Sequence, residues 1–274
     1  MNKYKEFSSS KIPDKFIEGI ANALRNYSTA LIRLSVGEDE KAIQELMGSG
    51  TFVTIGDMAG ILTAHHVANQ FLTSDGLGLT LIENEQNATI PWKHIRHIEV
   101  ATPVNDEHGP DLSFLVLPKP NLEGIMANKS FYPLSPIQKD NQAKRDPWFV
   151  YGTIGERTTK ESPNKGFVEV KGYYGFGGMT FAENIFSKGE FDYVEVKADY
   201  GERDTPRSFG GMSGGGIWRT PLLINDDEKI MAKGHFLSGV IFYQTSLKDG
   251  ARFLRCHGPE SLNVVYDAVI AQTK

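Results

Sequence analysis

A glycine-rich run around one serine is the feature that most constrains how this chain can fold. Residues 208–218 read Ser-Phe-Gly-Gly-Met-Ser-Gly-Gly-Gly-Ile-Trp, so five of the seven positions from 210 to 216 are glycine. Glycine is favoured where the backbone takes positive φ or approaches another group closely, and it costs conformational entropy elsewhere. The run therefore predicts a tight loop with accessible backbone amides.

Ser213, inside this loop, is a candidate nucleophile. A serine attacks a carbonyl only when a base takes its proton and hydrogen-bond donors stabilise the oxyanion that forms. A Gly-x-Ser-Gly-Gly turn can direct the N–H groups of Gly211 and Ser213 toward one point, which predicts an oxyanion hole. Taken alone, the same turn is equally typical of a serine that hydrogen-bonds only to nearby backbone.

Two upstream segments supply a base and a carboxylate. Residues 61–67, Ile-Leu-Thr-Ala-His-His-Val, form an apolar run that ends in a histidine pair, and residues 111–117, Asp-Leu-Ser-Phe-Leu-Val-Leu, begin with an aspartate. In the order His, Asp, Gly-x-Ser-Gly-Gly, these segments resemble the chymotrypsin-like (trypsin-like) serine peptidases, over about residues 49–270. The resemblance implies a Ser-His-Asp triad that acts through an acyl-enzyme intermediate.

The resemblance assigns the base to His66 and the orienting carboxylate to Asp111. The family's Thr-Ala-x-His pattern falls on residues 63–66, which makes His65 a packed or partly exposed neighbour. An imidazole with a pKa of about 6.5 can accept a proton near neutral pH. The other acidic candidates, in the polar loop Asp106-Glu107-His108, do not begin a hydrophobic strand, although an aspartate before a strand is often only a turn residue.

The resemblance places substrate binding along the run from Ser238 and Gly239 to Tyr243, which can pair with a peptide as an added strand. Arg207, six residues before the candidate nucleophile, corresponds to the floor of the specificity pocket. A cation there disfavours lysine or arginine at the cleavage site and favours an acidic side chain. The alternative is an arginine that points to solvent or pairs with Asp204.

Met212 departs from the family pattern. Many secreted members carry an aspartate just before the nucleophile, which pairs with a new N-terminus after zymogen cleavage, and a thioether cannot form that ion pair. We therefore expect control by loops, by the N-terminal helix or by an activating protein partner, not by N-terminal trimming.

Short strand-like runs separated by turn signals predict an all-β fold. The resemblance implies two six-stranded antiparallel β-barrels with an N-terminal helical extension and a C-terminal helix. Apolar residues at helical spacing predict helices over residues 12–25 and 259–271. The predicted strands cover residues 29–36, 50–55, 60–64, 78–82, 97–101, 112–117, 148–154, 166–173, 191–198, 215–218, 236–244 and 252–256.

These elements suggest five segments. Residues 1–47 would hold the N-terminal helix and a leading strand, with a short helix or ordered loop at 39–47. Residues 48–120 would form the first barrel, with His66 and Asp111, and residues 121–147 a proline-rich crossing between the barrels. Residues 148–258 would form the second barrel, with Ser213, and residues 259–274 the C-terminal helix.

Composition excludes several classes of partner. The formal net charge of −5 gives no reason to expect nucleic acid or an anionic membrane. No apolar run approaches the roughly 18 residues that span a bilayer, and the first ten residues lack an apolar signal core. Cys256 is the single cysteine, so no intrachain disulfide can form, which favours a cytoplasmic location.

We expect no metal and no organic cofactor. His94 and His97 have too few companions for a zinc site, and Cys256 with His257 adds only two scattered ligands. The glycine-rich run at 172–178 lacks the Lys-Ser/Thr and the following helix of a phosphate loop, so we expect a mobile loop near the cleft.

The sequence thus predicts a cytoplasmic serine endopeptidase that cleaves one dedicated protein partner at limited positions. Two alternatives stay open: a catalytically silent trypsin-like fold that serves as a protein-binding module, and an esterase-type hydrolase. The α/β-hydrolase form of an esterase is disfavoured because its triad follows the order Ser, Asp, His.

Overall fold

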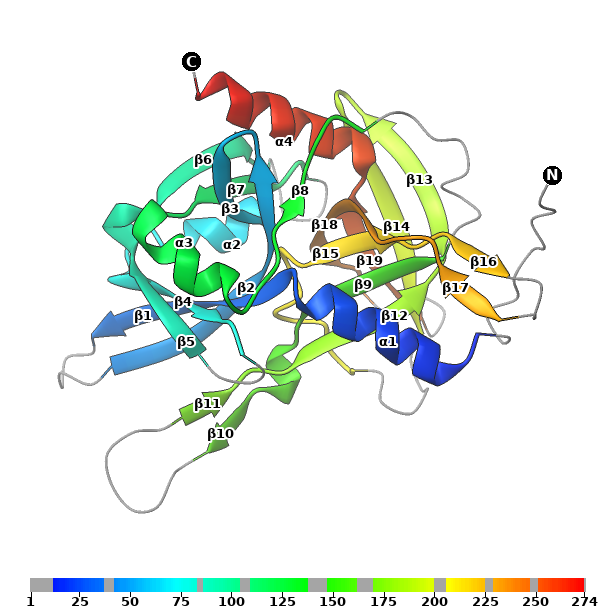
Figure 1. Cartoon of the computed structure of the whole chain (residues 1–274), viewed down its shortest axis with the longest axis horizontal. Helices are drawn as coiled ribbons and strands as arrows, with labels where there is room; N and C mark the ends of the chain where they lie inside the picture. Colours follow the sequence, from blue (N-terminus) through cyan, green and yellow to red (C-terminus); the bar gives the residue numbers. More distant parts are fainter. Residues whose placement is uncertain are drawn as a thin grey trace.

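Antiparallel β-structure makes up most of the molecule (Figure 1). Two large sheets form its body, one of eight strands and one of seven, together with two small two-stranded ladders. The computed structural model describes residues 12–36, 42–82, 86–103, 109–137, 147–161, 170–199, 206–224, 229–246 and 251–273.

The first sheet has the strand order β5-β4-β1-β2-β3-β7-β6, and β8 pairs with β2. All of its pairings are antiparallel except that of β8 with β2. Its strands are β1 (Ser28–Val36), β2 (Ala42–Ile55), β3 (Met58–Thr63), β4 (Gly76–Thr80), β5 (Gln86–Pro91), β6 (Arg96–Ala101), β7 (Leu112–Val116) and β8 (Tyr132–Pro133).

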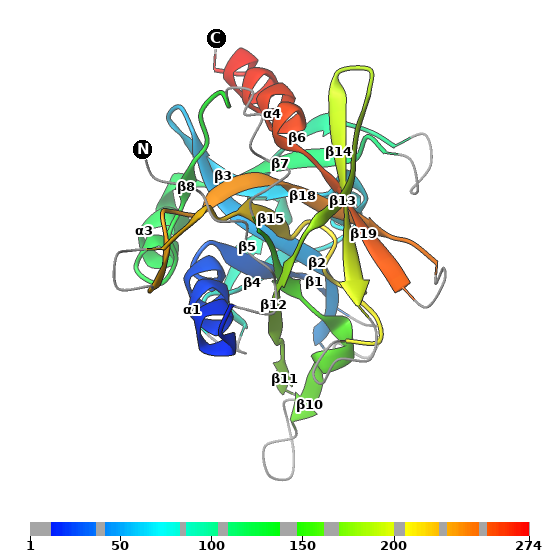
Figure 2. The same cartoon turned by 90° about the vertical axis from the view of Figure 1, so that its right-hand side faces the viewer.

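The second sheet has the order β12-β9-β15-β18-β19-β14-β13 and is antiparallel throughout. Its strands are β9 (Trp148–Thr153), β12 (Gly175–Thr180), β13 (Ala182–Lys188), β14 (Phe191–Asp199), β15 (Gly216–Arg219), β18 (Phe236–Gln244) and β19 (Ala251–His257). The small ladders are β10 (Thr159–Glu161) with β11 (Val170–Gly172), which projects from the body in Figures 1 and 2, and β16 (Leu222–Ile224) with β17 (Ile230–Ala232).

Both predicted helices are confirmed, as α1 (Asp14–Arg25) and α4 (Pro259–Ala271). Helix α1 buries Ile20 and Leu24, and α4 buries one face against the strands beneath it (Figure 1). The sequence did not predict two shorter helices, α2 (His65–Asn69) and α3 (Lys119–Met126). None of the helices in the described part of the chain is long and apolar enough to cross a membrane.

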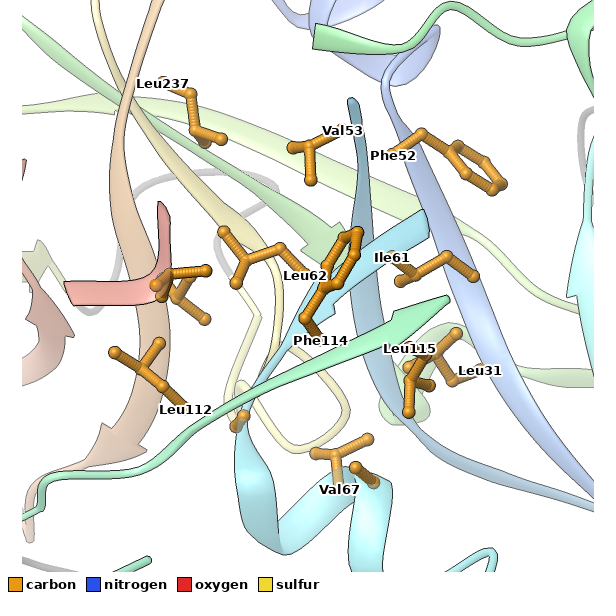
Figure 3. Close-up of a cluster of buried hydrophobic side chains, with 14 of the residues drawn as sticks. Leu31, Phe52, Val53, Ile61, Leu62, Val67, Leu112, Phe114, Leu115 and Leu237 are labelled. Atoms are coloured by element: carbon orange, nitrogen blue, oxygen red, sulfur yellow. The ribbon is translucent and has the colours of Figure 1, made fainter. Parts of the chain in front are cut away.

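One apolar core joins the two sheets. In Figure 3, Leu62 of β3 and Phe114 of β7 lie close to Val53 of β2, and Leu237 of β18 approaches them from the second sheet. All four side chains are at most 1% exposed. Because burial of this surface is the main force that holds the sheets together, residues from both sheets can meet in one site.

Three sequence predictions about the fold are wrong. The first is the separate N-terminal segment: residues 42–47, predicted as a short helix or ordered loop, belong to β2, and β1 lies inside the first sheet between β4 and β2. The second is the number of strands, because the sheets contain eight and seven strands, not six each.

The third correction concerns residues 172–178. Part of this run forms β12, because its glycines permit close packing: a Cβ at Gly177 would lie 2.6 Å from the Ala21 Cβ, and one at Gly175 would lie 2.3 Å from the Tyr151 hydroxyl. The glycines therefore seat β12 against β9 and α1.

Gly19 offers a test of helix α1. The residue is exposed, and a Cβ built there would have no neighbouring atom within 4 Å. Glycine in a helix interior costs about 0.5–1 kcal/mol relative to alanine. We expect Gly19→Ala to raise the free energy of unfolding in urea by about that amount, and a decrease would contradict an ordered α1 at this position.

Candidate active site

His66 and Asp111 form a two-point contact. The His66 backbone N–H donates to Asp111 Oδ1 at 2.9 Å, and the His66 Nδ1 atom lies 2.5 Å from Asp111 Oδ2. The Asp111 side chain is completely buried, whereas the His66 side chain is 33% exposed. Because both carboxylate oxygens accept from His66, the ring is held with Nδ1 toward the aspartate, and its Nε2 edge is directed away from it.

His65 contacts Ser113 of β7 and His97 of β6. Its Nδ1 atom lies 3.1 Å from Ser113 Oγ, and its ring stacks on His97 with centroids 5.7 Å apart. The side chain is 5% exposed. Of the histidine pair, the structure therefore places His66 against Asp111 and His65 among the packed residues of the first sheet. Asp106, Glu107 and His108 lie outside the described residues.

A second histidine, His257, lies behind Asp111. The Asp111 backbone N–H donates to His257 Nε2 at 3.0 Å, so the ring proton is on Nδ1, which lies 3.4 Å from Ser261 Oγ in the first turn of α4. Ser261 Oγ in turn donates to Asp192. This chain of contacts fixes the backbone of Asp111 from the side opposite His66.

Burial lowers the pKa of His257 to about 3, and the nearby Asp111 carboxylate opposes this shift. Between pH 3 and about 6.5 the unfolded chain binds a proton at His257 and the folded chain does not. The contribution of this histidine to stability is therefore complete above pH 6.5 and is lost as the pH falls, at about 1.4 kcal/mol per pH unit.

We expect this loss to disappear in His257→Gln. Between pH 7.0 and pH 5.5, the free energy of unfolding in urea should fall by about 1.4 kcal/mol more in the wild type than in the variant. The exposed His94→Gln is the control for loss of a histidine. Equal pH dependence in the wild type and His257→Gln would show that His257 is not a neutral, buried group.

The loop that carries Ser213 contacts the first sheet close to the start of helix α2, which carries His65 and His66. We call residues 208–215 the serine loop. The Ser49 backbone N–H of β2 donates to the Ser213 carbonyl at 2.7 Å. A Cβ at Gly214 would lie 2.0 Å from the Ser49 carbonyl oxygen and 2.1 Å from Thr63 Oγ1. Since Thr63 is three residues before His66, Ser213 and His66 are brought to the same edge of the first sheet.

Two amides in the serine loop remain without an acceptor. The N–H groups of Gly211 and Ser213 make no hydrogen bond to any described residue. Their neighbours in the loop are satisfied: Gly210 donates to Ser208 Oγ (3.2 Å), Met212 to the Phe209 carbonyl (3.0 Å), Gly214 to the Ile241 carbonyl (2.7 Å) and Gly215 to the Met212 carbonyl (2.8 Å).

The preceding carbonyls set the direction of these two amides. In a trans peptide the C=O of one residue and the N–H of the next point in opposite directions. The Gly210 carbonyl accepts from Gly155 N–H at 2.7 Å, and the Met212 carbonyl accepts from Gly215. The Gly211 and Ser213 N–H groups are therefore directed away from these partners, and positive φ at Gly211 (95°) permits the turn between them.

The Ser213 hydroxyl donates a long hydrogen bond, 3.4 Å, to the Phe242 carbonyl of β18. In the described structure its proton is therefore directed to β18 and not to the His66 ring. The Met212 side chain is completely buried in the core of the second sheet, so apolar packing anchors the serine loop at this position.

The predicted substrate-binding residues are only partly brought together. Phe242, the neighbour of Tyr243 in the chain, accepts from the Ser213 hydroxyl. Ser238 and Gly239 are packed elsewhere: Ser238 is 4% exposed, and a Cβ at Gly239 would lie 1.7 Å from the His257 carbonyl. The serine loop contacts β18 at Ile241, Phe242 and Gln244. Gln244 Oε1 accepts from the Phe209 N–H of the serine loop at 2.8 Å, a contact that the sequence did not predict.

Arg207 is exposed, and its predicted alternative partner, Asp204, lies outside the described residues. The assignment of Arg207 to the floor of a specificity pocket stays a prediction. Among the described residues, no group of three or more His, Cys, Asp or Glu side chains is arranged to hold a metal ion.

Comparison with known proteins assigns no family. No family model and no curated protein matches the chain. Among solved structures, the chain is similar to one described as "Aromatic interactions drive the coupled folding and binding of the intrinsically disordered Sesbania mosaic virus VPg protein". That similarity has a TM-score of 0.40 and 13% identity, and it covers 84% of this chain and 85% of the other.

Proposed function

We propose that the chain is a chymotrypsin-like serine endopeptidase in which each large sheet corresponds to one barrel of that fold. One observation carries the proposal. Of the amides in the serine loop, the two that the family uses as the oxyanion hole are the two without an acceptor among the described residues. The loop docks beside a histidine that is already paired with a buried aspartate.

In this mechanism Ser213 Oγ attacks the scissile carbonyl carbon while His66 Nε2 takes the hydroxyl proton. The carbonyl electron pair moves onto its oxygen, which accepts from the Gly211 and Ser213 N–H groups. When the tetrahedral intermediate collapses, the C–N bond breaks and the His66 proton passes to the leaving amine. Water then attacks the acyl-enzyme by the same route, releases the acid product and restores Ser213.

The Asp111 carboxylate keeps the His66 proton on Nδ1, so that Nε2 is the unprotonated ring nitrogen that accepts from serine, and it stabilises the imidazolium that forms. Attack requires Ser213 to turn from the Phe242 carbonyl toward His66, a change between staggered χ1 rotamers. Substrate that pairs with the Phe242–Gln244 edge of β18 would compete for the same carbonyl and favour this change.

The hydrogen bond from the Ser213 hydroxyl to the Phe242 carbonyl supports the second candidate, a catalytically silent fold that binds a protein partner. A hydroxyl held by the Phe242 carbonyl is not activated.

We propose that the active form acts in the cytoplasm by limited cleavage of a dedicated protein partner, with an activating partner as the source of control. The single cysteine, which is buried, and the apolar anchor at Met212 support this view.

Incubation with a peptide library and with short activated esters tests the function, with fragments identified by mass spectrometry. A peptidase produces new peptide termini with a consistent residue at the cleavage site, and Arg207 favours an acidic one. Turnover of esters alone indicates the esterase alternative. Absence of turnover of either substrate indicates the silent fold, and degradation of many unrelated folded proteins contradicts limited cleavage.

A further inference from the structure

We propose that Ser49, in the first sheet, is the positioning residue that holds the oxyanion hole of the second sheet in its open form. This inference rests on the proposed function, because it concerns the same two amides. Ser49 is not part of the Ser-His-Asp set, and no substrate contact is required of it.

Every polar group of Ser49 has a partner. Its N–H donates to the Ser213 carbonyl and its hydroxyl donates to the Gly211 carbonyl, both at 2.7 Å. The same hydroxyl oxygen accepts from Thr153 N–H of β9 at 2.7 Å. The Ser49 carbonyl accepts from Thr63 Oγ1 at 2.8 Å, and the residue is completely buried.

Ser49 can bind the serine loop because it lies just beyond the end of the pairing between β2 and β3. Strands β2 and β3 pair from Ile55↔Met58 to Thr51↔Leu62, and β3 ends at Thr63. Beyond that point none of the described strands pairs with β2 on this side, and the serine loop lies against its edge. The Ser49 N–H thus binds the Ser213 carbonyl where a ladder hydrogen bond would otherwise have been.

These bonds act on the peptides that surround the free amides. Ser49 holds the carbonyls of Gly211 and Ser213, and Gly155 holds that of Gly210. With these carbonyls held on their partners, none of them can rotate into the space in front of the Gly211 and Ser213 N–H groups. Removal of the Ser49 hydroxyl frees the Gly211 carbonyl, whose peptide lies between the two amides.

Ser49 also joins the pieces of the site across the two sheets. Through Thr63 it contacts the strand that leads to His66, and through Thr153 it contacts the second sheet. An oxyanion donor acts only when its N–H is correctly placed, and loss of one donor typically lowers the rate about 10²–10³-fold. A donor that is present but free to move should cost less, about 10–100-fold.

The test compares Ser49→Ala with Thr51→Val. Thr51 is also buried on β2, two residues further on, and its hydroxyl has no partner among the described residues. The valine variant therefore removes a buried hydroxyl from the same strand without breaking a hydrogen bond. Two quantities are measured for each variant: kcat and KM on the peptide substrate, and hydrogen exchange of a peptide that covers residues 209–218.

We expect Ser49→Ala to lower kcat about 10–100-fold with KM within about threefold of the wild type, and to speed exchange in 209–218 about tenfold. Thr51→Val should leave both unchanged. Wild-type kcat and exchange in Ser49→Ala overturn the proposal, as does an equal loss in Thr51→Val, which would indicate general disruption of β2.

If Ser49→Ala does not fold, Ser49→Cys replaces it. A thiol keeps the approximate volume but is a weaker donor, so slower turnover and faster exchange are expected, and wild-type values overturn the inference. If the wild type hydrolyses nothing, the proposed function fails, but the exchange measurement still decides whether Ser49 holds the serine loop.

Discussion

Replacement of Ser213 by alanine is expected to lower kcat/KM on the peptide substrate by at least about 10⁴-fold. The variant lacks the atom that forms the acyl bond, and the oxyanion hole and the binding edge of β18 can supply only the residual rate. The free energy of unfolding should stay within about 0.5 kcal/mol of the wild type, because among the described residues the Ser213 hydroxyl makes a single, long hydrogen bond.

Ser208→Ala is the matched control, since Ser208 lies in the same loop and is exposed. In the described part of the chain the Ser208 hydroxyl accepts a single 3.2 Å bond, from Gly210 N–H, so the kcat/KM of Ser208→Ala should remain within about threefold of the wild type. Equal activity in Ser213→Ala and the wild type would show that the hydrolysis comes from another site or from a contaminant.

Replacement of Asp111 by asparagine is expected to lower kcat about 10⁴-fold with little change in KM. Asp111 Oδ1 accepts from the His66 backbone N–H, so the amide oxygen of an asparagine must take that position. Its NH2 group then faces His66 Nδ1 and donates to it, which places the ring proton on Nε2. In that tautomer His66 cannot accept the proton of Ser213.

Asp57→Asn makes the same chemical change at an exposed position in the turn between β2 and β3, and should leave kcat unaltered. Circular dichroism and urea unfolding check that Asp111→Asn is folded. A folded Asp111→Asn variant with kcat within tenfold of the wild type would remove Asp111 from the mechanism.

The strands and helices with regular apolar periodicity could be predicted from the sequence, including α1 and α4. Strand β12 could not, because its glycines serve close packing against β9 and α1, and packing partners distant in sequence leave no local pattern. The place of β1 inside the first sheet depends on pairing with β4, which is equally non-local.

The same distinction applies to the site. His66, Asp111 and Ser213 could be selected because their segments follow a pattern, and the structure brings the first two into contact. The predicted binding run on β18 stays a prediction, and the part of β18 that contacts the serine loop is set by the pairing of Gly216 with Val240 and not by distance along the chain.

Ser49 and His257 were missed for a related reason. Each is a polar residue that is completely buried in a strand, and such groups must be hydrogen-bonded. Three of their partners, Gly211, Thr153 and Asp111, lie between 104 and 162 residues away, so the local sequence does not show which groups they bind.

Labelling with a fluorophosphonate probe, followed by intact-mass and peptide mass spectrometry, tests the central claim most directly. The probe reacts only with a serine that has an activated hydroxyl and a formed oxyanion hole. We predict one adduct per chain, on Ser213, that is lost in both Ser213→Ala and His66→Ala. A folded wild type that acquires no adduct, or an adduct on another residue, would contradict the assignment of this site as a serine peptidase centre.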